Sequence, residues 1–173
     1  MNKKTTDPQI LLDADVIRHF LNGGRIFDLP KIFPNQFVIL DIVKDELIRS
    51  KSLKQSVENF LDYSKIEIVS FPSKLEIIKE YAQLKQQFGE GESACMAVAR
   101  FEKKYIASSN LKDIKAYCKT YAIIYYTTMD LLCIAMEKKI LTNEDCNEFI
   151  KKVKEKGSKL PCDTIEEFQQ SLM

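Results

Sequence analysis

Short apolar runs alternate along the chain with longer segments in which apolar residues recur at helical spacing. The short runs have strand length and predict buried strands; they lie at 9–13, 37–40, 66–70, 105–109 and 121–126. The longer segments predict helices; they cover 16–21, 42–50, 53–63, 73–88, 93–103, 112–120 and 129–138, and a last helix opens at Thr142. Strands that alternate with helices in this way predict a parallel sheet covered on both faces.

The predicted helix at 93–103 is apolar nearly all round, so we expect it to be central and buried. We see no linker, repeat or low-complexity block, which indicates one domain. The fold class predicted is therefore α/β, a three-layer α/β/α sandwich with a central, mainly parallel sheet. The polar stretch 1–8 is expected to fray.

Composition narrows the functional classes only slightly. The net charge of +1 in 173 residues gives no global field that favours or excludes a polyanionic partner. Five cysteines are scattered without a CxxC pair, which is typical of small core residues in a reducing compartment. No apolar run reaches the roughly 18 residues of a membrane span, and the first apolar run is too brief for a secretion signal. We expect a cytoplasmic protein that does not bind membranes.

Asp13 stands at the carboxyl end of the first apolar run, and Asp15 follows two residues later. In an open α/β sheet, ligands bind in the crevice beyond the carboxyl ends of the strands, so an acid there can reach a metal ion or a substrate. An acid at this place can also cap the following helix. Because two aspartates compete for that one role, we assign Asp13 to a metal site and Asp15 to bonds with loops and the helix start.

Glu46 is placed by helical geometry. At about 100° per residue, Ile42, Val43 and Leu47 define an apolar face that includes Glu46, whereas Asp45 points away from it. A carboxylate on the buried side of a helix is costly unless it is paired or bound to a metal. Glu46 is therefore either a site residue or one partner of a salt bridge across the fold.

Glu92 opens the most apolar predicted helix, within the sequence Gly89-Glu90-Gly91-Glu92. The helix dipole alone is a sufficient reason for acids in a first helical turn. A phosphate cradle is not indicated, because two carboxylates repel a phosphate and no Lys-Ser/Thr pair follows. A bound cation would reverse that argument.

A further polar group follows the predicted strand at 105–109. Ser108, Ser109 and Asn110 end that strand, and Asp113 lies in the first turn of the next helix. These side chains face the same crevice as Asp13, although Asn110 capping the helix with Asp113 in its first turn is an equal alternative.

Other chemistries are poorly supported. Asp130 shares a helix face with Glu137, which favours a capping or solvent-facing role. His19, the only histidine, is expected to be a surface or core residue rather than a catalyst. We find no Ser/His/Asp order, zinc-ligand spacing or dinucleotide fingerprint. The functional signal is four acids placed at strand ends or on buried helix faces.

Four segments, taken in order, resemble the PIN-domain nucleases, which include the ribonuclease toxins of toxin–antitoxin pairs. They are Leu-Leu-Asp13-Ala-Asp15-Val-Ile, Val-Lys-Asp-Glu46-Leu, Gly-Glu-Gly-Glu92-Ser-Ala-Cys-Met-Ala-Val-Ala and Ser-Ser-Asn110-Leu-Lys-Asp113. Their order and relative spacing hold over residues 9–126. The Gly-Glu-Gly-Glu form and the later Thr-Thr-Met-Asp-Leu-Leu are similar to a subgroup with an extended helical C-terminus. The resemblance implies a single nuclease domain over 1–173, with 128–173 as a helical extension packed on it.

The resemblance also implies the site and its partners. The expected catalytic acids are Asp13, Glu46, Glu92 and Asp113, with the metal held by Asp13, Glu92 and Asp113 and with Asp15, Ser108 and Asn110 in support. Oxygen ligands without His or Cys suit Mg²⁺ or Mn²⁺. The expected activity is metal-dependent hydrolysis of RNA by the toxin of a toxin–antitoxin pair, as a homodimer with a possible antitoxin protein. The basic residues expected to contact the RNA backbone are Arg18, Lys44, Arg49 and Lys112.

Two departures from the family pattern keep alternatives open. The family commonly has aspartate at the place of Asn110, and aspartate is commoner than glutamate at the place of Glu92. A weakened metal site would leave a PIN-like module that binds RNA or protein without cleaving it. Asp13-Ala-Asp15-Val also fits the nucleophile motif of haloacid-dehalogenase-like phosphatases, but Lys112 and Asp113 match the rest of that machinery poorly.

Overall fold

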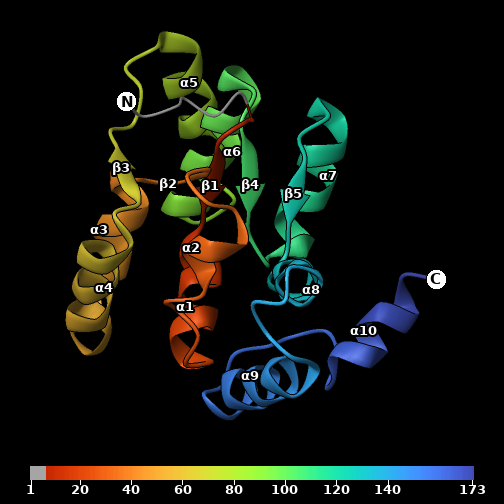
Figure 1. Cartoon of the computed structure of the whole chain (residues 1–173). Coiled ribbons are helices and arrows are strands. Elements are labelled where there is room, and N and C mark those ends of the chain that lie inside the picture. The colour runs from red at the N-terminus through yellow and green to blue at the C-terminus, as the bar shows by residue number, and fades with distance from the viewer. Residues whose placement is uncertain (1–6) are drawn as a thin grey trace.

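The computed structural model describes residues 7–173, so residues 1–6 of the stretch expected to fray lie outside the described part. Its centre is a five-stranded sheet in which every pair of neighbouring strands is parallel, in the order β3-β2-β1-β4-β5 (Figure 1). The strands are β1 (Ile10–Leu12), β2 (Phe37–Leu40), β3 (Glu67–Val69), β4 (Tyr105–Ala107) and β5 (Tyr125–Tyr126). The predicted α/β class with a parallel sheet is confirmed.

Helices cover both faces of this sheet (Figure 1). They are α1 (Ala14–Asn22), α2 (Leu29–Ile32), α3 (Asp41–Arg49), α4 (Lys51–Ser64), α5 (Leu75–Leu84), α6 (Glu90–Glu102), α7 (Leu111–Tyr121), α8 (Thr128–Glu137), α9 (Asn143–Glu155) and α10 (Ile165–Ser171). Helix α6 packs directly on β1, β2 and β4, and its residues from Gly91 to Ala99 are all buried, as expected for the most apolar helix.

The order of the strands creates a reversal point between β1 and β4. The chain runs outward from β1 through β2 to β3, then returns through α5 and α6 to β4 on the other side of β1. In open parallel sheets, ligands bind beyond the carboxyl ends of the strands at such a reversal. This places the crevice at the ends of β1 and β4, where Asp13 and Ser108 follow.

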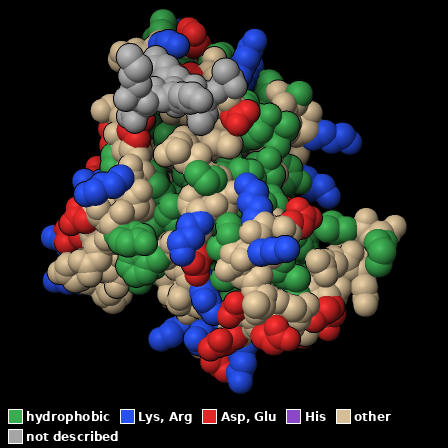
Figure 2. All heavy atoms as spheres, in the orientation of Figure 1, with side chains coloured by type: hydrophobic (Ala, Val, Ile, Leu, Met, Phe, Trp, Pro, Cys, Tyr) green, Lys and Arg blue, Asp and Glu red, His purple; other side chains and the backbone are tan. Residues whose placement is uncertain are grey.

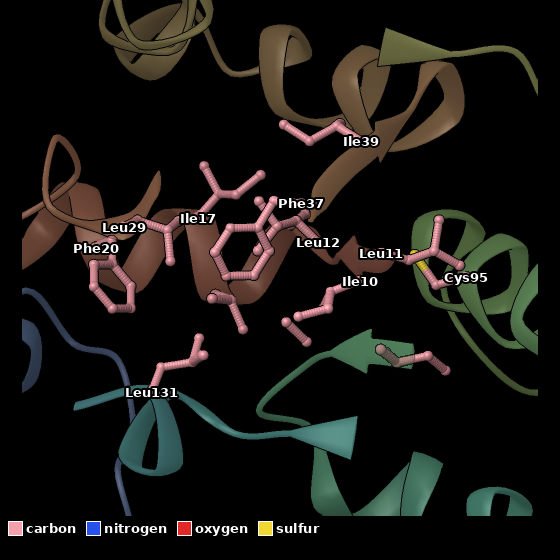
Figure 3. Close-up of a cluster of buried hydrophobic side chains, with 14 of the residues drawn as sticks. Ile10, Leu11, Leu12, Ile17, Phe20, Leu29, Phe37, Ile39, Cys95 and Leu131 are labelled. Carbon is pink, nitrogen blue, oxygen red and sulfur yellow. The ribbon is translucent and has the colours of Figure 1, made fainter. Parts of the chain in front are cut away.

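Alternation along β1 builds the core on both sides of the sheet. Figure 3 shows Leu11 beside Cys95 of α6, whereas Ile10 and Leu12 lie on the side of Phe37. All five side chains are at most 4% exposed. At about 1.5–3 kcal/mol for each large apolar side chain buried, this layer holds β1 firmly in place. The acid that ends β1 is therefore attached to a rigid element.

Two elements differ from the pattern-based expectation. The strand expected at 121–126 is only Tyr125–Tyr126, because α7 continues to Tyr121 and ends with Ala122 in a left-handed conformation (φ 53°). The helix expected at 73–88 covers only Leu75–Leu84, where Ile77 is buried and Leu75 is 63% exposed. The reason is that α5 packs mainly against α6 and buries a narrower stripe than its composition suggests.

The C-terminal helices follow clear capping signals. Thr127 and Thr142 each form a capping box with the aspartate three residues on, Asp130 and Asp145, so the predicted start of the last long helix at Thr142 is confirmed. Helix α9 packs on α1, and α10 packs on α8 and α9. Within residues 7–173, no helix is both long and apolar enough to cross a membrane.

Candidate active site

The four acids singled out in the sequence line one cavity at the carboxyl ends of β1 and β4. The cavity has a volume of about 260 Å³. Asp13, Glu46, Glu92 and Asp113 reach it from the end of β1, from α3, from the start of α6 and from the start of α7. The lining also includes Asp15, Arg18 and Asn110, together with Gln87, Phe88 and Gly89, whose backbone leads into α6.

Asp13 both caps α1 and faces the cavity. Its Oδ1 accepts from the backbone N–H of Ala14 at 2.7 Å, and its Oδ2 accepts from the hydroxyl of Ser108 at 3.1 Å. The side chain is buried, and burial, followed by the negative charge of Asp15, raises the pKa of Asp13 well above its usual range. The capping role and the proposed site role, weighed as alternatives from the sequence, fall on the same carboxylate.

Asp15 ties the loop after β4 to α1. Its Oδ2 accepts from the backbone N–H of Ser109 at 2.9 Å and from the hydroxyl of Ser108 at 3.5 Å. The expected bonds to a loop are therefore present, whereas the cap of α1 is made by Asp13 rather than Asp15. Burial raises the pKa of Asp15, and its Oδ1 is buried without a hydrogen-bond partner in the described part of the chain.

Glu92 is an acid of the cavity whose pKa lies far above its ordinary value. Burial, followed by the negative charges of Asp113 and Asp15, raises the pKa of Glu92 to about 7. Its side chain is 8% exposed, and its Oε1 is buried without a hydrogen-bond partner among residues 7–173. An acid in the first turn of a helix is favourable, but an unsatisfied buried oxygen is not. The helix dipole alone therefore does not explain Glu92.

Asn110 occupies the N-cap position of α7 without forming a side-chain cap bond. Its amide donates instead to Asp113 Oδ2 at 2.6 Å and, more weakly, to Glu92 Oε2 at 3.5 Å. The cap expected as an alternative is therefore absent, and the amide lies between two carboxylates of the cavity.

Glu46 is partly buried and combines the two roles inferred for it. Its Oε1 accepts from Arg18 at 3.0 Å, an ion pair within the cavity lining. Its Oε2 accepts from the backbone N–H of Gly91 at 3.2 Å. Asp45, expected to point away, is exposed.

Gly91 is a site residue that the sequence reasoning did not single out. A Cβ atom at this position would lie 2.6 Å from Glu46 Oε2 and 3.5 Å from Asp13 Oδ1. Only glycine lets the first turn of α6 come this close to the Glu46 carboxylate in its present position, whereas the distance to Asp13 is an ordinary contact. The available signal was a glycine placed between two acids at a helix start.

The basic residues expected near the acids take different positions. Arg18 lines the cavity, whereas Arg49 forms an exposed ion pair with Glu90, which also binds Lys85. Lys44 and Lys112 are not part of the cavity lining. Of the four basic residues expected near the acids, Arg18 is therefore the one that lines the cavity.

The fit to a metal ion rests on the chemistry of the donors. Among residues 7–173, no three His, Cys, Asp or Glu side chains already stand in an arrangement that would hold a metal ion. The cavity nevertheless gathers carboxylates with raised pKa values, and two buried oxygens, Asp15 Oδ1 and Glu92 Oε1, find no hydrogen-bond partner in the part of the chain that the structure describes. A cation relieves both the repulsion and the missing bonds, and all-oxygen donors suit a hard divalent ion.

The acidic cavity at the reversal point of the parallel sheet places the chain among α/β proteins with a ligand site at the carboxyl ends of their strands. The family model described as a PIN domain, DUF3368, matches residues 9–173. The chain therefore belongs to this PIN-domain family, which argues against the phosphatase alternative.

One similar solved structure is the crystal structure of VapBC2 from Rickettsia felis bound to a DNA fragment from their promoter. It aligns with a TM-score of 0.52 at 19% sequence identity, covering 68% of this chain and 97% of that chain. At this identity the similarity shows a shared fold. A search of curated proteins finds no significant match.

Proposed function

We propose that the protein is a Mg²⁺- or Mn²⁺-dependent endoribonuclease that hydrolyses RNA phosphodiester bonds, acting in the cytoplasm as the toxin of a toxin–antitoxin pair. The observation that carries this proposal is the convergence of Asp13, Glu46, Glu92 and Asp113, from four separate segments, on one cavity. Membership in the PIN-domain family supports a nuclease.

Asp13 and Glu92, with Asp113 directly or through a water, would hold the divalent ion. Such an ion, when bound, supplies positive charge at the phosphodiester and promotes ionisation of the attacking water. Ser108 and the N–H of Ala14 fix the carboxylate of Asp13 in its orientation. Asn110 holds Asp113 close to Glu92.

Glu46 and Arg18 act as a pair at the edge of this group. Glu46, held by the N–H of Gly91, is placed to orient the attacking water or to bind a second ion. Arg18 keeps further N–H donors beyond its bond to Glu46, and a guanidinium binds phosphate oxygens well. Lys44, Arg49 and Lys112 would contact the RNA backbone farther along the strand.

The proposed organisation is one domain in which residues 128–173 form a helical extension. Helix α10 packs on α8 and α9, which pack in turn on α2 and α1, and the VapBC2 match leaves about a third of this chain uncovered. We further propose a homodimer with an antitoxin partner, which the toxin–antitoxin nature of that similar complex supports.

RNA cleavage with matched variants tests the proposal. The wild-type protein should cleave single-stranded or structured RNA with Mg²⁺ or Mn²⁺ and stop when EDTA is added. Asp13→Asn should abolish cleavage, whereas Asp45→Asn, which changes an exposed acid outside the cavity, should leave it unchanged. Equal cleavage by wild type and Asp13→Asn would contradict the proposal.

A second candidate is a PIN-like module that binds RNA or protein without cleaving it. The observation in its favour is Asn110, whose neutral amide stands beside Asp113 and Glu92 where another carboxylate would strengthen a metal site. Calorimetric titration with Mn²⁺ separates the two candidates. Heat of binding at or below millimolar metal supports the nuclease, and its absence supports the binding module.

A further inference from the structure

A second cavity lies behind the loop that follows β4. It has a volume of about 190 Å³ and lies between this loop, the start of α8 and the C-terminal segment that carries α10. Met129 and Leu160, which are 1% and 9% exposed, contribute to its buried wall. Two half-buried aromatic side chains, Tyr125 and Phe168, also line it.

The loop after β4 separates this cavity from the acidic one, and its residues alternate between the two. Ser108 bonds Asp13, and Asn110 lines the acidic cavity. Ser109 and Leu111 line the second cavity. The two cavities are therefore one loop apart, so a flexible polymer held in one can place its next unit in the other.

The second cavity carries polar groups in its lining, which an apolar gap in the core would lack. Asp130 lines the cavity, and its Oδ2 accepts both cap bonds from Thr127, so its Oδ1 is available as a further acceptor. Lys159 lines the cavity and is exposed, and it forms no ion pair within residues 7–173. Aromatic rings, a carboxylate acceptor and a lysine that is unpaired among the described residues are a set that suits a nucleotide.

We propose that this second cavity binds an unstacked base of single-stranded RNA, adjacent to the phosphodiester held at the acidic cavity. The base would pack on Tyr125 and Phe168, since proteins that read single-stranded RNA stack splayed bases on aromatic side chains. Asp130 accepts from an exocyclic amino group, which favours adenine, cytosine or guanine over uracil. Lys159 meets the phosphate of the same nucleotide.

This inference rests on the proposed ribonuclease function for its substrate, but binding can be measured without cleavage. The first probe is the set of four ribonucleoside 5′-monophosphates, with ribose 5-phosphate as the control that lacks a base. In EDTA, the methyl signals of Met129, Leu111 and Leu172 should shift with the nucleotides and stay in place with ribose 5-phosphate. UMP should give the smallest shifts. Leu111→Ala should reduce these shifts, whereas Leu75→Ala, at another exposed leucine, should not.

The second probe is a single-stranded RNA oligonucleotide carrying one abasic site at each position in turn. Bound to Asp13→Asn in EDTA, it should lose affinity at one position by about 5-fold or more, the lower end of what one base–aromatic stack contributes. Lys159→Ala should weaken binding of the intact strand, while Lys156→Ala, at an exposed lysine nearby, should not.

Three results overturn the inference: equal shifts with ribose 5-phosphate, no shift with any nucleotide, or a flat abasic series. The second is also what a cavity built for a side chain of a protein partner would give. RNA cleavage together with an abasic series that shows no position-specific loss would refute the base site but support the ribonuclease function. A position-specific loss of affinity without any RNA cleavage would support the base site but contradict the ribonuclease function.

Discussion

The backbone N–H of Gly91 donates to Glu46 Oε2 at 3.2 Å and joins the first turn of α6 to α3. No side chain fits between them, because a Cβ atom on Gly91 would lie 2.6 Å from the same oxygen. The glycine therefore lets the Glu46 carboxylate keep its bond to the start of α6, and with that its position at the acidic cavity.

Gly91→Ala should impair the site more than the fold. The added methyl forces Glu46 aside, and a misplacement of about 1 Å at a catalytic group can cost roughly 100-fold in rate. We expect RNA cleavage to fall by about 10- to 100-fold. Gly89→Ala is the matched control, because nothing lies within 4 Å of a Cβ at that position. Similar losses in both variants would show that the close approach at Gly91 is not what matters.

Asn110→Asp should strengthen the binding of divalent cations. The change adds a carboxylate beside Asp113 and Glu92 and removes the amide that donates to them. We expect Mn²⁺ affinity to rise by about 10-fold, roughly 1.4 kcal/mol, in calorimetry at neutral pH. Asn110→Ala removes the same amide without adding charge and should show no such gain. Equal affinities for these two variants would refute a role for charge at this position.

Glu92→Gln should stabilise the protein when metal is removed. Burial raises the pKa of Glu92 to about 7 from an ordinary value of 4.5, so the folded state binds the proton more tightly than the unfolded state does. The stabilisation that comes from this tighter proton binding is fully present below about pH 4.5 and is lost as the pH rises through 7. In EDTA at pH 8, the variant should therefore be more stable by about 2–3 kcal/mol in urea unfolding. Glu137→Gln, at an exposed acid, should change stability little.

His19 should give stability the opposite dependence on pH. Its side chain is buried with Nδ1 at 2.8 Å from Thr128 Oγ1, and burial lowers the pKa of His19 to about 4 from 6.5. The unfolded state therefore takes up the proton first, so the contribution is present above pH 6.5 and is lost as the pH falls towards 4. Between pH 7 and 5, this residue should account for about 2 kcal/mol of lost stability.

The difference in free energy of unfolding between wild type and His19→Gln, measured against pH, isolates the contribution of His19. Carboxylates that titrate in the same range affect both proteins equally and cancel. The stability of the variant should depend less on pH between 7 and 5 than that of the wild type. Parallel curves for the two proteins would rule out a neutral buried His19.

The strand ends were visible in the sequence because parallel strands bring their carboxyl ends to one edge. Asp13 and Ser108 could be placed at the same crevice on that argument alone, and their hydrogen bond agrees with it. Glu46 could be oriented because a helix turns by a fixed angle per residue. In both cases a rule that applies within one strand or helix also indicates where the side chain lies in the whole fold.

Gly91, the exposed Leu75 and the short β5 could not be predicted in this way. Each depends on a distance between elements far apart in the chain: α3 to α6, α5 to α6, and the end of α7 to the sheet edge. Periodicity shows which face of a helix is apolar, but how much of that face a neighbour covers is decided by packing.

Arg18→Gln should weaken RNA binding more than Arg49→Gln. Each arginine forms an ion pair with a glutamate, but only Arg18 of the two lines the acidic cavity. Arg18 donates to Glu46 inside the cavity, whereas Arg49 donates to Glu90 outside it, at 3.0 and 3.1 Å. If Arg18 also meets a phosphate, its loss should lower the slope of log affinity against log salt by about 0.7, as expected for one contact to a single strand. The measurement is the RNA affinity of Asp13→Asn, alone and combined with each arginine change, at several salt concentrations. Loss of affinity in Arg18→Gln with an unchanged slope would mean that Arg18 only holds Glu46 in place. An equal effect of Arg49→Gln would mean that Arg18 contributes no more to RNA binding than a backbone contact outside the cavity does.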